Sequence, residues 1–171
     1  MKEKIIIRKA KFGDAKKVAE LIELGLKTKN FNYTGANSPW DKKKIKKIDE
    51  GYKNNGGIAL LAFDEEKNIL VGSINCSFKM HGRLRHRGDC GWSVHPEYQG
   101  KGIGTKLLNE LIKEAKKRGL KRLEAEMAIK NTGSWKLAEK CGFKIEGTKK
   151  QGLLTDEGKY IDTYIVGKII K

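Results

Sequence analysis

The sequence contains few cysteines and no long apolar run. Its three cysteines, Cys76, Cys90 and Cys141, are too few and too scattered for a disulfide framework, and none forms a Cys-x-x-Cys metal pair. Each lies in or beside an apolar run, where a small core residue is more common than a nucleophile. The apolar run Ile5–Ile7 is too short for a signal peptide, and no later stretch approaches the length of a membrane span. These absences predict a cytoplasmic protein that does not enter a membrane.

Arginine is scarce although the chain is strongly basic. Only six of its 37 basic residues are arginine, the other 31 are lysine, and the net charge is +16. Nucleic-acid modules tend to concentrate arginine and aromatic residues on one face, whereas scattered lysine is usually a solvated surface. Such a field still attracts anions, so a ribosome, an RNA or another acidic partner stays open. It argues weakly against polycationic substrates, unless their pocket is locally acidic.

Proline and low-complexity sequence are also scarce. Only two prolines occur in 171 residues, and no internal repeat or linker interrupts the chain. With 38% hydrophobic residues, the chain is long enough to bury one sizeable core. We therefore expect a single domain that covers residues 1–171.

The apolar pattern predicts both strands and helices. Short or alternating apolar runs predict strands at Ile5–Arg8, Ile58–Phe63, Ile69–Phe78, Asp89–Val94, Leu123–Met127, Phe143–Lys149 and Tyr160–Ile169. Helical spacing predicts one helix from Ile103 to the stop at Gly119, and three more capped by Asp14, by Asp41, and by Asn131 or Thr132. Thr28–Trp40 is expected to be a loop. This order predicts a mixed sheet with helices on its faces.

A basic stretch, His81–Arg87, contains two histidines. Two histidines at this spacing raise the question of a metal site, but no Asp, Glu or Cys lies among them to complete one. A charged hairpin tip is the favoured interpretation. We therefore expect no bound metal.

The stretch Gln99–Thr105 reads Gln-Gly-Lys-Gly-Ile-Gly-Thr and lies between a predicted strand and a predicted helix. A glycine loop that opens a helix binds anions, because unpaired backbone N–H groups and the helix dipole point at the same place. A Cβ in such a loop would hold a phosphate away from those N–H groups. The spacing fits neither the Rossmann nor the P-loop template. The stretch therefore predicts an anion site outside the usual nucleotide folds, with a flexible turn as the alternative.

The form Gln-x-x-Gly-x-Gly on a strand, loop and helix resembles the pyrophosphate loop of the GNAT superfamily of acetyl-coenzyme A (acetyl-CoA) dependent N-acyltransferases. The resemblance covers Ile5 to Ile170 and rests on three stretches in order. Gly91–Gly104 is similar to the family's fourth strand and loop, and Asn131–Ser134 with Glu139–Phe143 to its Asn-x-x-Ser helix and Glu-Lys-x-Gly-Phe ending. Glu146–Thr148 and Gly158–Tyr164 resemble the tail of the ribosomal-protein alanine N-acetyltransferase branch. The implied fold is α/β, with a mixed, mostly antiparallel sheet of about seven strands and helices on both faces.

This resemblance implies an enzyme that moves the acetyl group of acetyl-CoA to a primary amine, by direct attack in a ternary complex. The amine would belong to a protein N-terminus or a small molecule. The implied cofactor contacts are Val94, Gln99, Gly100, Lys101, Gly102, Ile103, Gly104, Thr105, Asn131 and Ser134. An RNA- or ribosome-binding protein on the same scaffold, without turnover, is the alternative. The identity of the acceptor and the oligomeric state, a homodimer included, stay open.

Three residues are implied to take part in the chemistry. Asp89 aligns with the carboxylate often found two residues before the strand glycine, which implies a general base, although an exposed or ion-paired residue is an equal alternative. Many relatives carry a tyrosine as the acid in the last helix, but Ala138 stands at that position here. Ser134 matches the serine of the ribosomal-protein branch, and could instead be a polar contact at the helix start. Tyr164 is a further candidate for the acid.

Overall fold

The computed structural model describes residues 4–27, 40–54, 56–79 and 82–171. Its strands are β1 (Ile5–Lys9), β2 (Gly57–Asp64), β3 (Ile69–Phe78), β4 (Arg87–Val94), β5 (Arg122–Ala128), β6 (Lys144–Leu154) and β7 (Tyr160–Ile169). Its helices are α1 (Ala15–Leu26), α2 (Lys42–Lys53), α3 (Ile103–Lys117) and α4 (Thr132–Lys140), with short 3-10 helices at Gly82–Leu84 and Pro96–Tyr98. Every strand and helix expected from the apolar pattern is present in the expected order.

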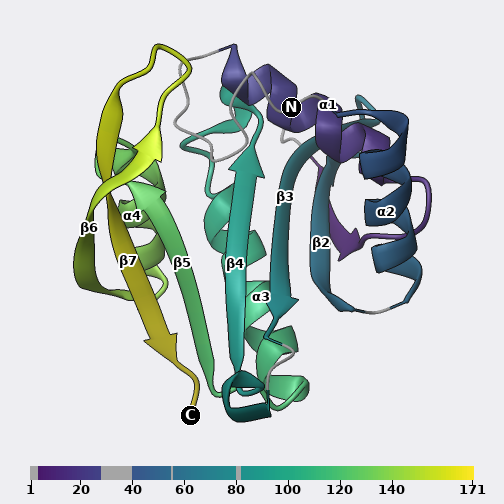
Figure 1. Ribbon diagram of the computed structural model, residues 1–171. Coiled ribbons are helices and arrows are strands. Elements are labelled where there is room, and N and C mark those ends of the chain that lie inside the picture. Colours follow the sequence, from purple (N-terminus) through teal and green to yellow (C-terminus); the bar gives the residue numbers. More distant parts are fainter. Residues whose placement is uncertain (1–3, 28–39, 55, 80–81) are drawn as a thin grey trace.

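The seven strands form one sheet in the order β1-β2-β3-β4-β5-β7-β6. All neighbouring pairs are antiparallel except β4 and β5, which are parallel. This parallel pair is short, because only Arg87–Asp89 is in register with Arg122–Glu124. Beyond it the two strands diverge, so residues 90–94 and 125–128 face each other without pairing (Figure 1). We call this the β4–β5 opening. The mixed, mostly antiparallel sheet confirms the predicted fold class.

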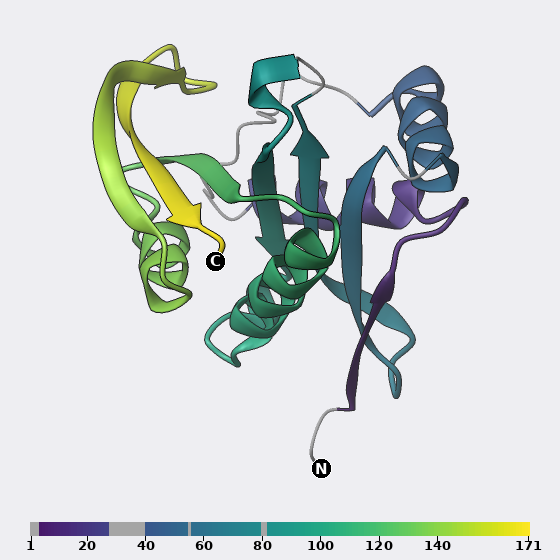
Figure 2. The same ribbon diagram turned by 90° about the horizontal axis from the view of Figure 1, so that it is seen from below.

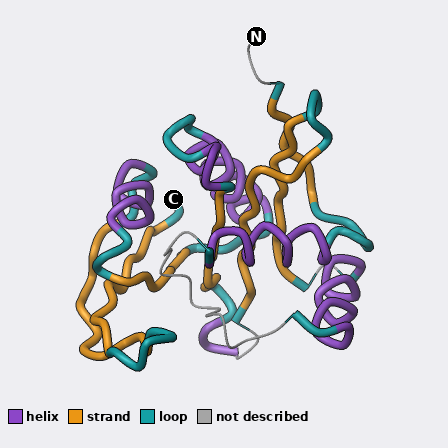
Figure 3. Tube along the Cα trace, turned by 90° about the horizontal axis from the view of Figure 1, so that it is seen from above, coloured by secondary structure: helices purple, strands orange, loops and turns teal. Residues whose placement is uncertain are grey.

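Helices cover both faces of the sheet. α3 and α4 lie on one face, and α1 and α2 lie on the other (Figures 2 and 3). The apolar α3 residues that recur with helical spacing are buried against the sheet: Ile103, Leu107, Leu108, Leu111 and Ala115. On the other face α1 contributes to a smaller cluster that contains Val18, Leu21, Leu61, Phe63 and Leu70.

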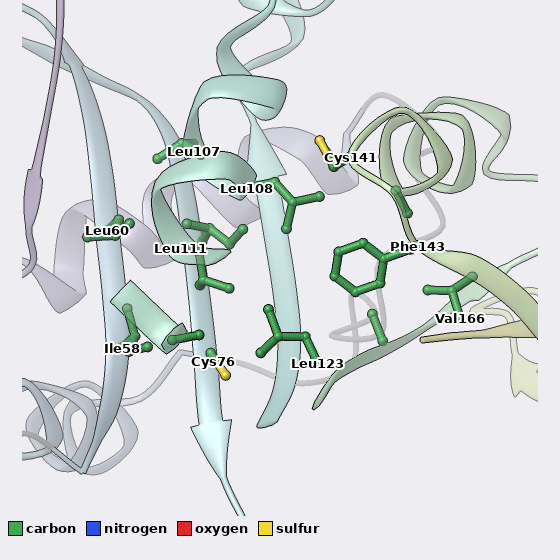
Figure 4. Packing of buried hydrophobic residues seen from close by; sticks show 14 of the residues in the cluster. Ile58, Leu60, Cys76, Leu107, Leu108, Leu111, Leu123, Cys141, Phe143 and Val166 are labelled. Carbon is green, nitrogen blue, oxygen red and sulfur yellow. The ribbon is translucent and has the colours of Figure 1, made fainter. Parts of the chain in front are cut away.

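The main core joins the two halves of the sheet beneath α3. Figure 4 shows the α3 leucines between Leu60 of β2 on one side and two residues on the other, Val166 of β7 and Phe143, which precedes β6. All of these side chains are at most 4% exposed. Truncating one such leucine to alanine typically costs about 2–5 kcal/mol, so the contacts are strong enough to fix the two halves relative to each other. The strand edges along the β4–β5 opening are therefore held by a single core.

Two of the predicted helix caps are confirmed, and one is wrong. Asp41 and Asn131 accept backbone N–H groups at the starts of α2 and α4. Asp14 occupies the N-cap position of α1, but its side chain caps no N–H group of that helix. Its carboxylate instead accepts hydrogen bonds of 2.7 and 2.9 Å from Arg8 and one of 2.8 Å from the Lys11 N–H. A charged bidentate partner is stronger than a neutral cap, which explains the difference.

Asp49 of α2 supplies hydrogen bonds to the start of α1. Its Oδ1 atom accepts the N–H groups of Gly13 and Ala15, both at 3.0 Å. Asp49 is 8% exposed, so this carboxylate is a buried link between the two helices. The position of α2 therefore depends on α1 as well as on the sheet.

Several smaller expectations also have an outcome. β6 extends to Leu154 rather than ending at Lys149, with an irregular register between Lys149 and Leu153. Of the predicted loop Thr28–Trp40, only Trp40 is described, and His81 also lies outside the described residues. Within the described ranges, no helix combines the length and the apolar character that a membrane crossing needs.

Candidate active site

Within the described residues, the Val94 N–H group on the edge of β4 that faces β5 has no partner on that strand. In an antiparallel pair, alternate residues direct their N–H and C=O groups toward the partner strand, and the residues between them direct theirs away. Arg87 and His95 face β3, because the Arg87 carbonyl accepts from the Lys79 N–H (3.2 Å) and the His95 N–H donates to the Val71 carbonyl (2.9 Å). The alternation directs the Val94 N–H the other way, into the β4–β5 opening.

The glycine loop Gln99–Thr105 leads from the end of β4 into α3. Gly100 and Gly102 have φ angles of +74° and +79°, which favour glycine, and Gly102 is the N-cap of α3. A Cβ added to either glycine would meet nothing within 4 Å, so the space beside them is open. The N–H groups in the first turn of α3 have no acceptor within the helix. With the positive end of the helix dipole, they form a site suited to a pyrophosphate.

Other members of the loop are held by their neighbours. The Gln99 side-chain amide donates to the Val94 carbonyl at 3.3 Å, so it ties the loop to the end of β4. Gly104 serves packing rather than conformation, because an added Cβ would lie 2.8 Å from the Leu137 side chain of α4. Thr105 is half-buried in the first turn of the helix. The loop is therefore fixed on both sides.

Tyr98 anchors the entry to the loop. It is 1% exposed, and its hydroxyl donates to Asp64 Oδ2 at 2.7 Å, at the end of β2. This hydrogen bond, with those from the Glu66 and Lys67 N–H groups, outweighs burial and lowers the pKa of Asp64. The Lys101 ammonium lies 4.6 Å from the centre of the Tyr98 ring. A loop lysine is thus placed over a residue that the core holds in position.

A cavity of about 550 Å³ lies beside the β4–β5 opening. Its walls come from the end of β1, α1, α2, β2 to β5, the second half of α3 and the start of α4. The β4, β5 and α4 residues among its lining include Gly91, Trp92, Ser93, Glu126, Met127, Asn131 and Ser134. On the α1 and α2 side the lining is mostly apolar and includes Ile22, Trp40, Ile48 and Tyr52. A volume of this size suits a small ligand.

Asn131 and Ser134 meet at the cavity, whereas Tyr164 does not reach it. The Asn131 Oδ1 atom accepts the Ser134 N–H at 3.2 Å, and this bond fixes the start of α4. Tyr164 packs edge-on against Trp135, with ring centres 5.9 Å apart. Tyr164 is absent from the described residues that line the cavity.

Asp89 lies where β4 still pairs with β5. It is opposite Glu124 in the parallel register and forms an ion pair with Lys79. Val94 lies five positions further along the strand, which is about 16 Å in an extended chain. Asp89 is likewise absent from the described part of the cavity lining. Its surroundings match the ion-paired alternative, and its role as a base stays a prediction.

Glu126 is a carboxylate at the cavity that the sequence analysis did not single out. It lies on β5, one residue before Met127, and lines the cavity with it. Its Oε1 atom accepts the Thr163 hydroxyl at 2.5 Å and its Oε2 atom accepts the Lys149 ammonium at 3.2 Å. The alternation of Glu124 and Glu126 with apolar residues was the available signal, because it places both carboxylates on one face of β5. The two carboxylates differ in position, because Glu124 lies where β5 still pairs with β4 and Glu126 lies beyond that point, in the β4–β5 opening.

A second carboxylate of the lining, Glu114, is less suited to chemistry. It belongs to the second half of α3, eleven residues after Ile103, or about 16 Å along the helix axis from the glycine loop. Ion pairs with Lys117 and Lys9 lower the pKa of Glu114 to about 2. These contacts indicate a structural residue.

Glu124 fastens the junction at which β4 and β5 begin to diverge. Its Oε2 atom accepts hydrogen bonds from Arg87 Nε (3.2 Å) and Arg122 Nε (3.3 Å). Burial alone would raise the pKa of Glu124, but the two guanidinium groups outweigh it and lower the pKa. Arg122 also binds Glu146 of β6 and lowers the pKa of that carboxyl. The ion pairs connect β4, β5 and β6 across the base of the opening.

The three cysteines pack in or against the core, which agrees with the prediction that they are small core residues. Cys76 and Cys141 are buried, and Cys90 is half-buried directly opposite Cys76 in the register of β3 and β4. The contact with Cys76, together with burial, raises the pKa of Cys90, and burial raises the pKa of Cys141. Among the side chains that the structure describes, no three His, Cys, Asp or Glu gather in a group that could hold a metal ion.

The sequence matches the model of the acetyltransferase (GNAT) family over residues 26–143, which is more than half of the chain. The chain belongs to the GNAT family. The fold agrees, because a GNAT acetyltransferase of Streptococcus pneumoniae superposes with a TM-score of 0.82 at 27% identity, covering 98% of this chain and all of that one. The glycine loop and the β4–β5 opening are thus features of a GNAT domain.

The names of individual relatives refer to different acceptors. An L-amino acid N-acetyltransferase of Escherichia coli K12 is 28% identical over 101 residues, 58% of this chain and 62% of that protein. The chain thus spans less than two thirds of this curated relative. A ribosomal-protein-alanine N-acetyltransferase of Brucella melitensis has a TM-score of 0.84 at 26% identity, covering 96% of this chain and 99% of that one. The fold is also that of YncA from Salmonella typhimurium, solved with acetyl-CoA (TM-score 0.84, 22% identity, 98% and 94% covered).

Proposed function

We propose that this GNAT protein transfers the acetyl group of acetyl-CoA to a primary amine within one ternary complex. The observation that carries the proposal is that the edge of β4 at Val94, where the N–H has no partner on β5 among the described residues, continues into the glycine loop at the start of α3. A ligand with an extended hydrogen-bonding arm next to a pyrophosphate fits both features, and acetyl-CoA has both. The acetyl-CoA complex of the Salmonella protein with the same fold supports this assignment.

Three groups of residues are proposed to hold acetyl-CoA. The backbone N–H groups from Gly100 to Thr105 bind the pyrophosphate, and the Lys101 ammonium adds a positive charge beside it. The edge of β4 near Val94 pairs with the pantetheine arm, and Gln99 keeps that edge and the loop together. Asn131 and Ser134 complete the site from α4.

Acetyl-CoA supplies the thioester carbonyl that the acceptor amine attacks. The Val94 N–H is proposed to donate a hydrogen bond to the oxygen atom on which negative charge develops. Glu126 is proposed to take the proton of the acceptor ammonium, directly or through water, because it is a carboxylate in the wall of the cavity. Ser134 and Tyr164 are the candidates for returning a proton to, or hydrogen-bonding, the leaving thiolate. Of these two, Ser134 lines the cavity.

Asp89 stays the alternative base, and a pair of variants separates it from Glu126. Glu126→Gln should lower kcat by about 100-fold or more, the usual contribution of a general base, with little change in the Kd for acetyl-CoA. Asp89→Asn should leave kcat near the wild-type value, because Asp89 is ion-paired with Lys79 away from the cavity. The opposite pattern would assign the base to Asp89.

The acceptor is proposed to be an α-amino group. The names of the Escherichia coli and Brucella relatives refer to amino acids and to the alanine of a ribosomal protein, and both acceptors present such a group. The cavity of about 550 Å³ has room for a group of amino-acid size. A thiol-release assay with L-amino acids, peptides with free N-termini and simple amines measures the preference directly. Turnover confined to amines without a neighbouring carbonyl would contradict the assignment.

A melting experiment distinguishes this proposal from RNA binding without turnover. Saturating acetyl-CoA should raise the Tm by mass action, whereas an RNA-binding protein should show salt-sensitive RNA binding that coenzyme A does not alter. An unchanged Tm at saturating acetyl-CoA would count against the enzyme. A ribosomal or other acidic partner, a homodimer and a cytoplasmic location stay predictions.

A further inference from the structure

Thr163 of β7 is fully buried, and its hydroxyl donates to Glu126 Oε1 at 2.5 Å. Glu126 pairs directly with Ile165 and Ala128 with Thr163, so Thr163 is the diagonal neighbour of Glu126 on the same face of the sheet. A buried hydroxyl requires a hydrogen-bond partner, and the carboxylate supplies it. Valine would fill the same volume without a polar atom. The hydroxyl therefore has a specific use at this position.

Lys149 of β6 holds the other oxygen of the same carboxylate. Its ammonium lies 3.2 Å from Glu126 Oε2, and its backbone is directly opposite Thr163 in the register of β6 and β7. Thr163 therefore lies between Glu126 on one neighbouring strand and Lys149 on the other. The two donors therefore bind different carboxylate oxygen atoms of Glu126.

The irregular part of β6 is shaped around Thr163. Between Lys149 and Leu153 the register shifts, and Gln151 has a φ of +51° with its N–H bonded to Asp162 Oδ1 at 2.9 Å. A Cβ on Gly152 would lie 2.1 Å from Thr163 Oγ1. Glycine is therefore needed where β6 passes over the hydroxyl. The irregularity covers the hydroxyl with backbone while it keeps Lys149 on Glu126.

We propose that Thr163 and Lys149 are positioning residues for Glu126, which hold its carboxylate in one orientation and keep it ionised as a proton acceptor. Both donate hydrogen bonds to the charged form, and such bonds favour that form. This inference rests on the proposed function and on Glu126 as its base. The other carboxylates on the strands around Glu126 have cation partners of their own: Glu124 with Arg87 and Arg122, Glu146 with Arg122, Asp89 with Lys79, and Asp162 with Lys150. Thr163 and Lys149 donate the described hydrogen bonds to Glu126, so the loss of either should alter its titration.

The pH dependence of kcat/KM, measured with one amine acceptor for all variants, tests the inference. Thr163→Val and Lys149→Met should each move the acid limb to higher pH by about one unit, and so lower kcat/KM about tenfold on that limb. Thr163→Ser restores the hydroxyl and should restore the limb. Lys144→Met removes an exposed charge from the same strand and should leave the profile unchanged. The alkaline limb, which includes titration of the acceptor amine, should be the same in all of them.

Two sites are used so that an effect on folding can be told from an effect on Glu126, because Thr163 is buried and Lys149 is exposed. If Thr163→Val lowers the Tm, Lys149→Met still tests the inference at a side chain that is 56% exposed. The inference would be overturned, and the proposed function left intact, if Glu126→Gln were inactive while Thr163→Val and Lys149→Met kept the wild-type acid limb. Full activity in Glu126→Gln would also overturn it. A wild-type protein that acetylates no amine would overturn the proposed function itself.

Discussion

The Tyr98 hydroxyl donates a 2.7 Å hydrogen bond to the Asp64 carboxylate, which stands 34 residues earlier at the end of β2. Both side chains are 1% exposed. Tyr98 immediately precedes the glycine loop, and Asp64 also accepts the N–H groups of Glu66 and Lys67 in the β2–β3 turn. The contact therefore joins the start of the glycine loop, which is the proposed cofactor site, with the turn between β2 and β3.

Tyr98→Phe should lower both stability and acetyl-CoA affinity. The Tyr98 hydrogen bond is the main cause of the lowered pKa of Asp64, whose ordinary value is 3.8. A lowered pKa stabilises the fold above the ordinary value, and this stabilisation is lost as the pH falls through the folded value. The Tm difference between wild type and variant should thus be largest near neutral pH and shrink as the pH falls below the ordinary value of 3.8. Tyr160→Phe, at a side chain 64% exposed, is the control, and an equal effect there would contradict the anchor role.

Gly102→Ala should destabilise the loop without any steric clash. Gly102 has a φ of +79° at the N-cap of α3, and an added Cβ meets nothing within 4 Å. A left-handed conformation costs an L-residue about 1–2 kcal/mol, so we expect a loss of that order and a weaker Tm response to acetyl-CoA. Gly51→Ala, inside α2 and also free of contacts, should be neutral or slightly stabilising. Identical cofactor responses in the two variants would argue against a role for the loop geometry.

Glu124→Gln should loosen the junction of β4 and β5. Hydrogen bonds from Arg87 and Arg122 to a buried carboxylate lead us to expect a loss of about 2 kcal/mol at neutral pH. The pKa of Glu124 is lowered in the fold, so the difference should shrink as the pH falls below the ordinary value of 4.5. Urea unfolding at several pH values measures it, with the exposed Glu20→Gln as control. A difference that stays constant down to acid pH would contradict the ion-pair explanation.

The thiols should react slowly in the native protein. The pKa values of Cys90 and Cys141 are raised, by contact with Cys76 and burial in the first case and by burial in the second. Thiolate is the reactive form, so a thiol reagent at neutral pH should label the folded protein far more slowly than the unfolded one. Fast labelling of one native cysteine, mapped by mass spectrometry, would show that a thiol is accessible and reactive.

Local patterns predicted the elements and the glycine loop, because both depend on residues close together in the sequence. The α3 stripe from Ile103 follows from helical spacing, and the stop follows from the glycine at 119, which has a φ of +79° in the structure. The Gln-x-x-Gly-x-Gly spacing similarly placed the loop at a helix start. These features need no knowledge of the neighbouring strands.

The wall of the cavity could not be predicted in the same way. Thr163 and Glu126 are 37 residues apart, and they meet only because β7 lies between β5 and β6 in the sheet. Asp49 likewise supports α1 from 34 residues away in place of the predicted Asp14. Such contacts depend on strand order and on the divergence of β4 from β5, which leave no periodic trace in the sequence.

Transfer of an isotope-labelled acetyl group from acetyl-CoA to a primary amine is the most direct test of whether the β4–β5 opening is an active site. Wild-type protein should produce acetylated amine and free thiol in equal amounts, and Glu126→Gln should bind acetyl-CoA normally but form product at least about 100-fold more slowly. Bound acetyl-CoA with no acetylated product from any amino acid, peptide or simple amine would contradict the proposed function.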